Sequence, residues 1–262
     1  MEKIITLENI SKTYNGRHVL NDISHDFYRG ESIAFTGHNG CGKSTLLKAI
    51  AGLIRISKGN INYHNKIRFS YVPEKFPGLD ITVYKYLSSV AEMEGVDYSD
   101  VQTLIEDFFL EDMVNIRMSN LSKGSLQKVG VIQALMAPHD VILLDEPLSG
   151  QDADSQNVFV TKIRRLKERG ITVIMSCHEK KLIEELSDKQ FSIEKGKLIE
   201  TAIESVVRYR ISVKANDSLE KWPIMRQMDG RNTFDVKESD IKAAVMKLYD
   251  EGWEIIGIEE HI

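Results

Sequence analysis

Apolar residues are arranged in two different ways along this chain of 262 residues: in short continuous runs and at helical spacing. Largely apolar runs occur at 33–35, 141–144 and 171–175, and each is followed by a polar or glycine-rich segment. Such runs are typical of parallel strands that are buried on both faces of a sheet. From about residue 82 to residue 137 the apolar positions instead recur every three or four residues, which predicts helices. The pattern therefore predicts an α/β domain that is interrupted by an all-helical insert at about 82–137.

The two ends of the chain show shorter, alternating runs. Residues 3–36 contain strand-like runs on either side of Tyr14-Asn15-Gly16-Arg17, a composition typical of a hairpin turn. Beyond about residue 204 the predicted order is strand, strand, helix and strand. We therefore expect one domain at 1–204, with an N-terminal antiparallel β subdomain, and a small α+β appendage at 205–262.

The segment 37–45 joins a predicted strand to a predicted helix and is rich in glycine. It fits the pattern of glycine, four residues, glycine, lysine and serine or threonine, which binds the phosphates of a nucleotide. Glycines let backbone N–H groups approach phosphate oxygens, and the following helix directs its positive end at the same anion. Lys43 is expected to place its positive charge beside the β- and γ-phosphates, and the Ser44 hydroxyl is expected to be a ligand of Mg²⁺. The residues expected to bind ATP here are Gly37, Asn39, Gly40, Cys41, Gly42, Lys43, Ser44 and Thr45.

Acidic residues follow the apolar run at 141–144. Asp145 stands where a buried strand ends, and the carboxyl ends of such strands face the ligand crevice of an α/β sheet. We expect Asp145 to be a second contact for Mg²⁺ and Glu146 to orient or deprotonate a water that attacks the γ-phosphate. His178 ends a neighbouring predicted strand and can reach the same crevice. A lone histidine is more often structural, but its placement beside Glu146 favours a functional role.

Composition limits the remaining classes of function. Charged residues make up 28% of the chain and the hydrophobic set 42%, which indicates a globular protein. The net charge of −5 argues against a partner that is a nucleic acid bound by bulk electrostatics. No apolar run approaches the roughly 20 residues that span a bilayer, and we expect no secretory signal. Cys41 and Cys177 are too few for a disulfide framework, and the Cys41 thiol is expected to react with thiol reagents when nucleotide is absent.

Further motifs occur in a fixed order, and together they resemble those of the nucleotide-binding subunit of an ATP-binding cassette (ABC) transporter. The stretch 121–127 (LSKGSLQ) is similar to the LSGGQ signature of that family. Residues 145–152 (DEPLSGQD) resemble its acidic strand end and the loop after it, usually DEPTSGLD. His178 matches its switch histidine, and Tyr14 matches its adenine-stacking aromatic. Glu74 stands where the family usually has a glutamine that senses Mg²⁺ and the permease.

The resemblance implies a P-loop NTPase core with an N-terminal antiparallel β subdomain, an inserted α-helical subdomain and a small C-terminal α+β appendage. It also implies that Mg²⁺ and ATP are held between two such subunits, in a homodimer or a heterodimer. Ser122 and the Gly124 amide would contact the nucleotide of the partner. ATP hydrolysis would power transport through a separate integral-membrane permease, which would hold the cytoplasmic protein on the inner face of the membrane. On this interpretation the catalytic residues are Glu146, His178 and Lys43, and the metal ligands are Ser44, Asp145 and Glu74.

Three positions depart from the family pattern. Lys123 replaces a glycine and would place a charge beside the phosphates of the partner. Ser125 replaces the signature glutamine, and Glu74 would turn an anionic group toward the metal. The Ser122-Lys123-Gly124 form and Glu74 resemble exporter-type subunits that serve separate permeases for drugs, peptides, lipids or sodium, so we expect export. A cleft near 74–86 is expected to receive a short helix of the permease.

Two other functions fit parts of the sequence. A soluble ABC ATPase that acts on ribosomes or DNA would carry two cassettes or a long coiled coil between its phosphate loop and signature. Here Lys43 and Ser122 are 79 residues apart (122 minus 43) in a chain with one cassette. A nucleotide-gated scaffold would bind ATP without using hydrolysis, and Glu146 and His178 argue against it.

Overall fold

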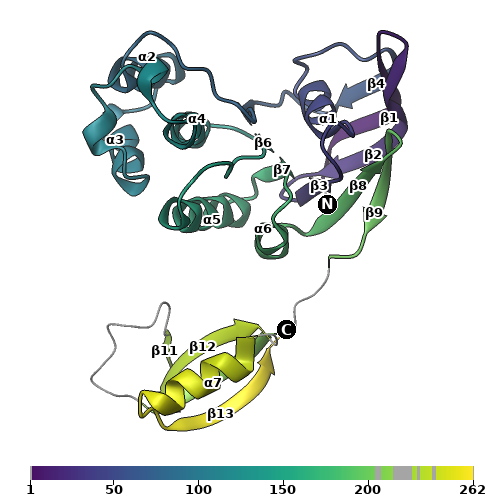
Figure 1. Ribbon diagram of the computed structural model, residues 1–262. Helices are drawn as coiled ribbons and strands as arrows, with labels where there is room; N and C mark the ends of the chain where they lie inside the picture. The colour runs from purple at the N-terminus through teal and green to yellow at the C-terminus, as the bar shows by residue number, and fades with distance from the viewer. Residues whose placement is uncertain (1, 204–207, 215–225, 229–230, 238–239, 262) are drawn as a thin grey trace. The chain divides into compact units, whose positions relative to one another are not determined.

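The computed structural model describes residues 2–203, 208–214, 226–228, 231–237 and 240–261. The chain divides into two compact units, Met1–Ile203 and Glu204–Ile262, each with its own sheet and core (Figure 1). Within the described ranges, no helix has both the length and the apolar character that crossing a membrane requires.

A six-stranded sheet forms the centre of the first unit, in the order β5-β6-β7-β3-β8-β9. Neighbouring strands are parallel except β8 and β9, which form a hairpin whose turn is Lys195-Gly196. Parallel neighbours require crossover connections, and the helices of this unit supply them. The strands are β3 (Ser32–Thr36), β5 (Phe69–Val72), β6 (Val141–Asp145), β7 (Thr172–Ser176), β8 (Lys189–Glu194) and β9 (Lys197–Thr201).

A second, antiparallel sheet in this unit has the order β2-β1-β4. Its members are β1 (Lys3–Tyr14), β2 (Arg17–Tyr28) and β4 (Lys58–Tyr63). The turn between β1 and β2 falls at Asn15 and Gly16, both of which have a positive φ. This confirms the expected N-terminal antiparallel β subdomain.

Helices connect the strands and also build the insert. The described helices of the first unit are α1 (Lys43–Ile50), α2 (Val83–Glu94), α3 (Tyr98–Asp107), α4 (Lys123–Met136), α5 (Ala153–Glu168) and α6 (Lys180–Leu186), with 3₁₀ turns at Glu111–Met113 and Met118–Asn120. The Thr82 side chain accepts a hydrogen bond from the Lys85 amide at the start of α2, and Gly95 ends that helix at φ 69°. The expected helical insert is therefore present between β5 and β6.

The two faces of the six-stranded sheet bury separate apolar clusters. On one face, alternate residues such as Ile142 and Leu144 pack with α4, α5 and the insert. On the other, Val141 and Leu143 pack with α1 and the antiparallel sheet. Every residue of β6 and β7 is buried, which explains the continuous apolar runs in the sequence. Covered on both faces, the two strands present their carboxyl ends to the site on a rigid support.

The second unit has a four-stranded antiparallel sheet, β11-β12-β10-β13, with helix α7 packed across one face. Its buried core is Ile211, Val213, Phe234, Leu248 and Trp253. The elements are β10 (Arg208–Lys214), β11 (Arg226–Met228), β12 (Arg231–Lys237), α7 (Ile241–Asp250) and β13 (Ile255–His261). Strand β11 was not expected, because a strand of three residues is too short to show a period in the sequence.

Candidate active site

Glycines set the backbone conformation of the loop between β3 and α1. Gly42 caps α1 with a φ of 119°, where a Cβ would lie 3.0 Å from the carbonyl oxygen of Val19. Gly40 has a φ of 78°, and a Cβ there would meet no protein atom within 4 Å. Both conformations favour glycine. The loop thus has the open inner surface and the helix N-terminus that bind an anion.

Both cysteines are buried in the core beneath this region. The exposed fraction of Cys41 is 7%, and it packs with apolar residues of the antiparallel sheet and α1. Burial raises the pKa of the Cys177 thiol to about 12. The burial of Cys41 argues against the expected reaction with thiol reagents in the absence of nucleotide, which stays a prediction, because its side chain faces the core while its backbone forms the loop.

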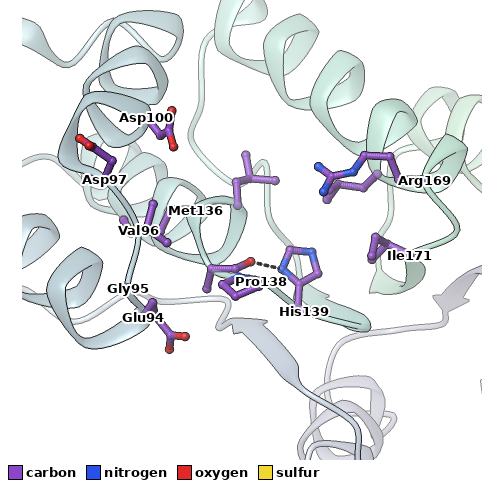
Figure 2. Close-up of a pocket in the computed structure, with 13 residues that line it drawn as sticks. Glu94, Gly95, Val96, Asp97, Asp100, Met136, Pro138, His139, Arg169 and Ile171 are labelled. Atoms are coloured by element: carbon purple, nitrogen blue, oxygen red, sulfur yellow. Dashed lines mark hydrogen bonds between the residues drawn. The ribbon is translucent and has the colours of Figure 1, made fainter.

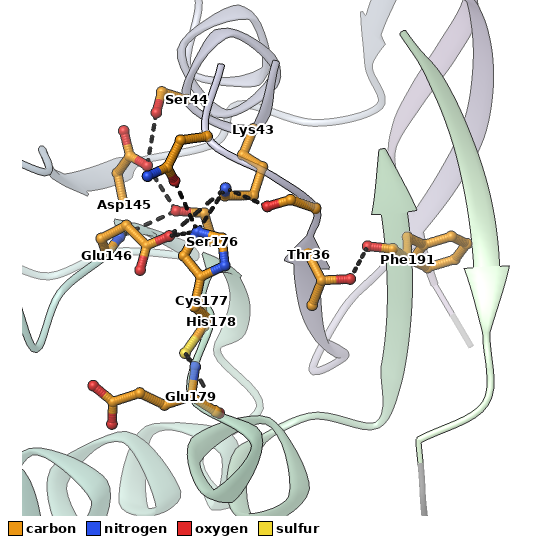
Figure 3. Close-up of polar contacts among 12 residues, drawn as sticks. Thr36, Lys43, Ser44, Asp145, Glu146, Ser176, Cys177, His178, Glu179 and Phe191 are labelled. Carbon is orange, nitrogen blue, oxygen red and sulfur yellow. Dashed lines mark hydrogen bonds and ion pairs between the residues drawn. The ribbon is translucent and has the colours of Figure 1, made fainter. Parts of the chain in front are cut away.

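Four side chains form a polar cluster beside the loop: Asn39, Lys43, Glu146 and His178 (Figure 3). The Lys43 Nζ donates to the Gly37 carbonyl at 2.9 Å and lies 3.0 Å from Nε2 of His178. The same Nε2 is 3.1 Å from Oε1 of Glu146 and 3.2 Å from Oδ1 of Asn39. A single ring nitrogen can accept from the lysine or donate to an oxygen, but not both at once. His178 can therefore exchange partners between the loop and Glu146.

Glu146 is held in an unusual backbone conformation at the end of β6. Its φ is 49°, and its amide donates to the carbonyl and the hydroxyl of Ser176 at 3.2 and 3.1 Å. Burial raises the pKa of the Glu146 carboxyl, the nearby His178 and Lys43 oppose the rise, and two neighbouring carboxylates add to it. Its Oε1 is buried, and the Nε2 of His178 at 3.1 Å and the Nζ of Lys43 at 3.8 Å approach it. A carboxylate made more basic in this way is a better proton acceptor near neutral pH.

Asp145 accepts hydrogen bonds from three hydroxyl groups. Ser44 of the phosphate loop donates to it at 3.0 Å, Ser176 at 2.7 Å and Tyr71 at 3.3 Å. Burial and the negative charge of Asp145 raise the pKa of Tyr71, so the phenol stays protonated. Ser176 and Tyr71 were not predicted as site residues from the sequence. Their only signal is a hydroxyl on a strand that borders β6, and Ser176 pairs directly with Asp145 in the register.

A pocket of about 270 Å³ lies between the phosphate loop, Glu74 and Glu146. Its lining includes Glu74, which the structure brings to the same space as Ser44 and Glu146. Within the described ranges, no three His, Cys, Asp or Glu residues could hold a metal by themselves. Mg²⁺ usually combines one or two protein oxygens with phosphate oxygens and waters, so these residues fit an ATP–Mg²⁺ complex. The lining residues are Asn39, Gly40, Gly42, Lys43, Ser44, Thr45, Glu74 and Glu146.

Five predicted nucleotide contacts are not part of that lining: Gly37, Cys41, Tyr14, Ser122 and Gly124. Tyr14 ends β1 with 45% of its surface exposed, and the Lys12 Nζ lies 4.6 Å from its ring centre. Ser122 caps α4 and accepts from the Ser125 amide at 3.1 Å. Gly124 lies in the first turn of α4.

The first turn of α4 packs on the loop that follows Glu146. Lys123 donates to the Ser149 hydroxyl at 2.8 Å, so its ammonium is bound within its own chain. A Cβ at Gly124 would lie 2.1 Å from the Gly150 carbonyl oxygen. Two segments that are remote in the sequence, the signature and the loop after β6, therefore form one surface.

Comparison with known proteins gives the family. The ABC transporter family matches residues 20–149. An uncharacterised ABC transporter ATP-binding protein of Methanocaldococcus jannaschii is 32% identical, and the match covers 99% of this chain and 95% of that protein. The chain belongs to the ABC transporter ATP-binding proteins. The zinc import ATP-binding protein ZnuC of Wigglesworthia glossinidia brevipalpis is 35% identical over 66% of this ABC protein and 76% of its own length.

Solved structures agree with this assignment. The ATP-binding subunit of an ABC transporter superposes with a TM-score of 0.69 at 25% identity, over 76% of this chain and 90% of that one. A dimeric ATP-binding cassette bound to ADP and phosphate has the same fold, with a TM-score of 0.69 at 19% identity over 77% and 99% of the two chains. This ABC protein is an ATP hydrolase with the P-loop NTPase fold expected from its sequence.

The close contact at Gly124 predicts a stability effect in this ABC protein. Gly124→Ala should lower the free energy of unfolding by about 1–3 kcal/mol, because its methyl group must displace the Gly150 backbone. Urea unfolding measures the change. Gly257→Ala is the control, because a Cβ at Gly257 would meet nothing within 4 Å. Equal stability of the two variants would contradict the contact.

A cavity of about 350 Å³ lies near the amino ends of β6 and β7, between the helical insert and α5 (Figure 2). None of the predicted site residues lines it. The His139 Nδ1 lies 2.6 Å from the Ala137 carbonyl, so Nδ1 carries the proton and donates. Its Nε2 is buried and has no hydrogen bond within the described residues. Burial lowers the pKa of His139, which keeps the ring neutral.

This neutral histidine makes stability of the ABC protein depend on pH. Its pKa in the folded state lies below the ordinary value of 6.5, so the unfolded chain takes up a proton first as the pH falls. The free energy of unfolding should therefore decrease as the pH drops below about 6.5. His139→Asn should make this decrease smaller in urea unfolding, whereas His64→Asn, at an exposed position, should not. The same pH dependence in both variants would exclude His139 as a cause.

Proposed function

We propose that this ABC protein binds ATP and Mg²⁺ in the pocket beside Lys43 and uses hydrolysis to drive a separate membrane permease. The observation that carries the proposal is the polar cluster. Lys43 from the phosphate loop, Glu146 from the end of β6 and His178 from the segment after β7 meet within 4 Å of one another. A phosphate-binding cation and a residue that positions or deprotonates the attacking water are recurring parts of sites that hydrolyse a γ-phosphate, and Lys43 and Glu146 supply them.

Each residue of the proposed site has a role that its contacts support. Lys43 binds the β- and γ-phosphates, and the glycine loop supplies backbone donors to them. Glu146 accepts a proton from the attacking water, and His178 holds the Glu146 carboxylate in place through the 3.1 Å contact. Ser44 and Asp145 offer oxygens to Mg²⁺, and Glu74 completes that side of the pocket. Mg²⁺, when bound, neutralises charge on the phosphates.

The proposal includes a second nucleotide-binding subunit. Ser122 and Gly124 lie outside the lining of the pocket in their own chain, while α4 offers a helix N-terminus at that point. Two copies that face one another would place this N-terminus against the partner's phosphates, which is a favourable position for an anion. Tyr14 would stack on the adenine. Dimerisation with ATP and release after hydrolysis then form the two-state element that a permease can follow.

Direction of transport stays a prediction. Export was expected from the Ser122-Lys123-Gly124 form and from Glu74. The similar proteins include subunits named for zinc import, so the comparisons do not favour export.

Purification from membranes tests the proposed function. The tagged protein, extracted in mild detergent, should bring with it a membrane protein with several predicted spans, identified by mass spectrometry. The pair in liposomes should hydrolyse ATP faster than the subunit alone, and Lys43→Ala should abolish the activity. A protein that leaves the membrane alone and hydrolyses ATP at an unchanged rate with or without liposomes would contradict the permease and favour a soluble ABC ATPase.

A further inference from the structure

A buried glutamine in α4 has no role in the site described above. Gln127 has an exposed fraction of 0%. Its side-chain nitrogen donates to the Pro73 carbonyl at 2.8 Å, while its Oε1 is buried without a hydrogen bond among the described residues. Leaving a buried polar atom unpaired costs about 1–3 kcal/mol, so an apolar residue would be the simpler choice for this position. The amide therefore needs an explanation other than packing.

The bond that Gln127 makes reaches the nucleotide pocket through a rigid unit. The Pro73 carbonyl and the amide nitrogen of Glu74 belong to one planar peptide group. Fixing that carbonyl therefore restrains the position of the Glu74 Cα, which lies in the same plane. Glu74 lines the pocket together with Ser44 and Glu146. One hydrogen bond thus connects helix α4 to the segment after β5 that carries the pocket residue Glu74.

A second attachment holds the same segment on its other side. A Cβ at Gly130 of α4 would lie 2.4 Å from the Phe76 ring, so the absence of a side chain there admits the ring. Phe76 also packs edge to face with Tyr86, at 5.9 Å between ring centres. The Tyr86 hydroxyl donates to Gln133 of α4. Glu74 therefore lies between two points, residues 73 and 76, that are both fastened to α4.

We propose that Gln127 is a positioning residue that sets Glu74 in the nucleotide pocket and so makes Mg²⁺ binding there depend on helix α4. The inference rests on the proposed function, because it takes Glu74 to face the metal. It adds a physical link from the signature turn, Ser122 to Ser125, to the metal side of the pocket in the same chain. A movement of α4 is passed to Glu74 by the Gln127 amide and by Phe76.

Direct binding measurements test the inference without using turnover. ATP binding is measured by calorimetry in the Glu146→Gln background, over a series of Mg²⁺ concentrations. Gln127→Met conserves side-chain volume and removes the donor, and Gln127→Glu keeps the shape and loses the amide. Each should raise the Mg²⁺ concentration for half-maximal binding roughly five- to tenfold, the effect expected of one lost hydrogen bond. Gln102→Met, at an exposed position on α3, is the control and should cause no shift.

A double-mutant cycle with Glu74→Ala identifies the route. If Gln127 acts through Glu74, Gln127→Met should change the Mg²⁺ dependence less than about twofold once Glu74 is alanine. An equal shift in both backgrounds, or no shift in a folded Gln127→Met protein, would overturn the inference. If Glu74→Ala itself changes nothing, the metal role of Glu74 and the inference both fail, while loss of ATP binding in Lys43→Ala would still support the proposed nucleotide site.

Discussion

Glu146→Gln should reduce ATP turnover by about 10²- to 10⁴-fold, the range expected for the loss of a general base. The amide has nearly the same shape and should leave ATP binding intact, but it cannot accept a proton. The expectation follows from burial, which raises the pKa of Glu146, and from the 3.1 Å contact that orients it on His178. Steady-state phosphate release gives the rate, and calorimetry gives the affinity for ATP.

A matched substitution separates this role from a general effect of charge. Glu92→Gln changes an exposed carboxylate on α2, far along the chain from the site, and should leave turnover unchanged. Turnover of Glu146→Gln within tenfold of the unsubstituted protein would remove Glu146 from the role of base. In that case the raised pKa of Glu146 would reflect its burial and not a role in proton transfer.

Lys43→Met should weaken ATP binding by about 30- to 1,000-fold, as expected when one member of a buried, hydrogen-bonded charge pair is lost. Lys43 has an exposed fraction of only 6%, and its ammonium lies among the Gly37 carbonyl, His178 and Glu146. Its removal takes away the positive charge nearest the expected phosphates. It also leaves the buried Glu146 without one of the two charges that oppose the rise in its pKa.

Lys48→Met is the control for this prediction. Lys48 lies in the last turn of the same helix, α1, and does not line the pocket. Equilibrium binding of a fluorescent ATP analogue measures both variants. Equal affinity of the Lys43 and Lys48 variants would show that the pocket beside the phosphate loop is not where the triphosphate binds.

Much of the site could be predicted because its chemistry depends on local order in the sequence. The phosphate loop needs glycine, lysine and serine in consecutive positions, and Asp145 and His178 follow apolar runs that end at the same edge of a parallel sheet. The insert was likewise predicted from the helical spacing of its apolar residues, and the N-terminal hairpin from its turn residues. In each case a single segment carries the signal, and the fold only brings the segments together.

The remaining features depend on pairings that no single segment shows. Ser176 bonds to Asp145 because β6 and β7 pair in that register. The bond between Lys123 and Ser149 joins segments 26 residues apart, and neither segment indicates this pairing by itself. The burial of Cys41 likewise follows from the packing of α1 on the antiparallel sheet. Such contacts are decided by tertiary packing, which residue types alone leave open.

The claim that two ATP-binding subunits close on ATP is tested most directly by the mass of the Glu146→Gln protein in solution. Sedimentation velocity with saturating ATP and Mg²⁺ should give a dimer, because loss of the base leaves the bridging triphosphate intact. The same protein with ADP, which lacks the γ-phosphate, should give a monomer. A Glu146→Gln protein that remains a monomer with saturating ATP and Mg²⁺, both alone and with the membrane protein that co-purifies with it, would contradict the account.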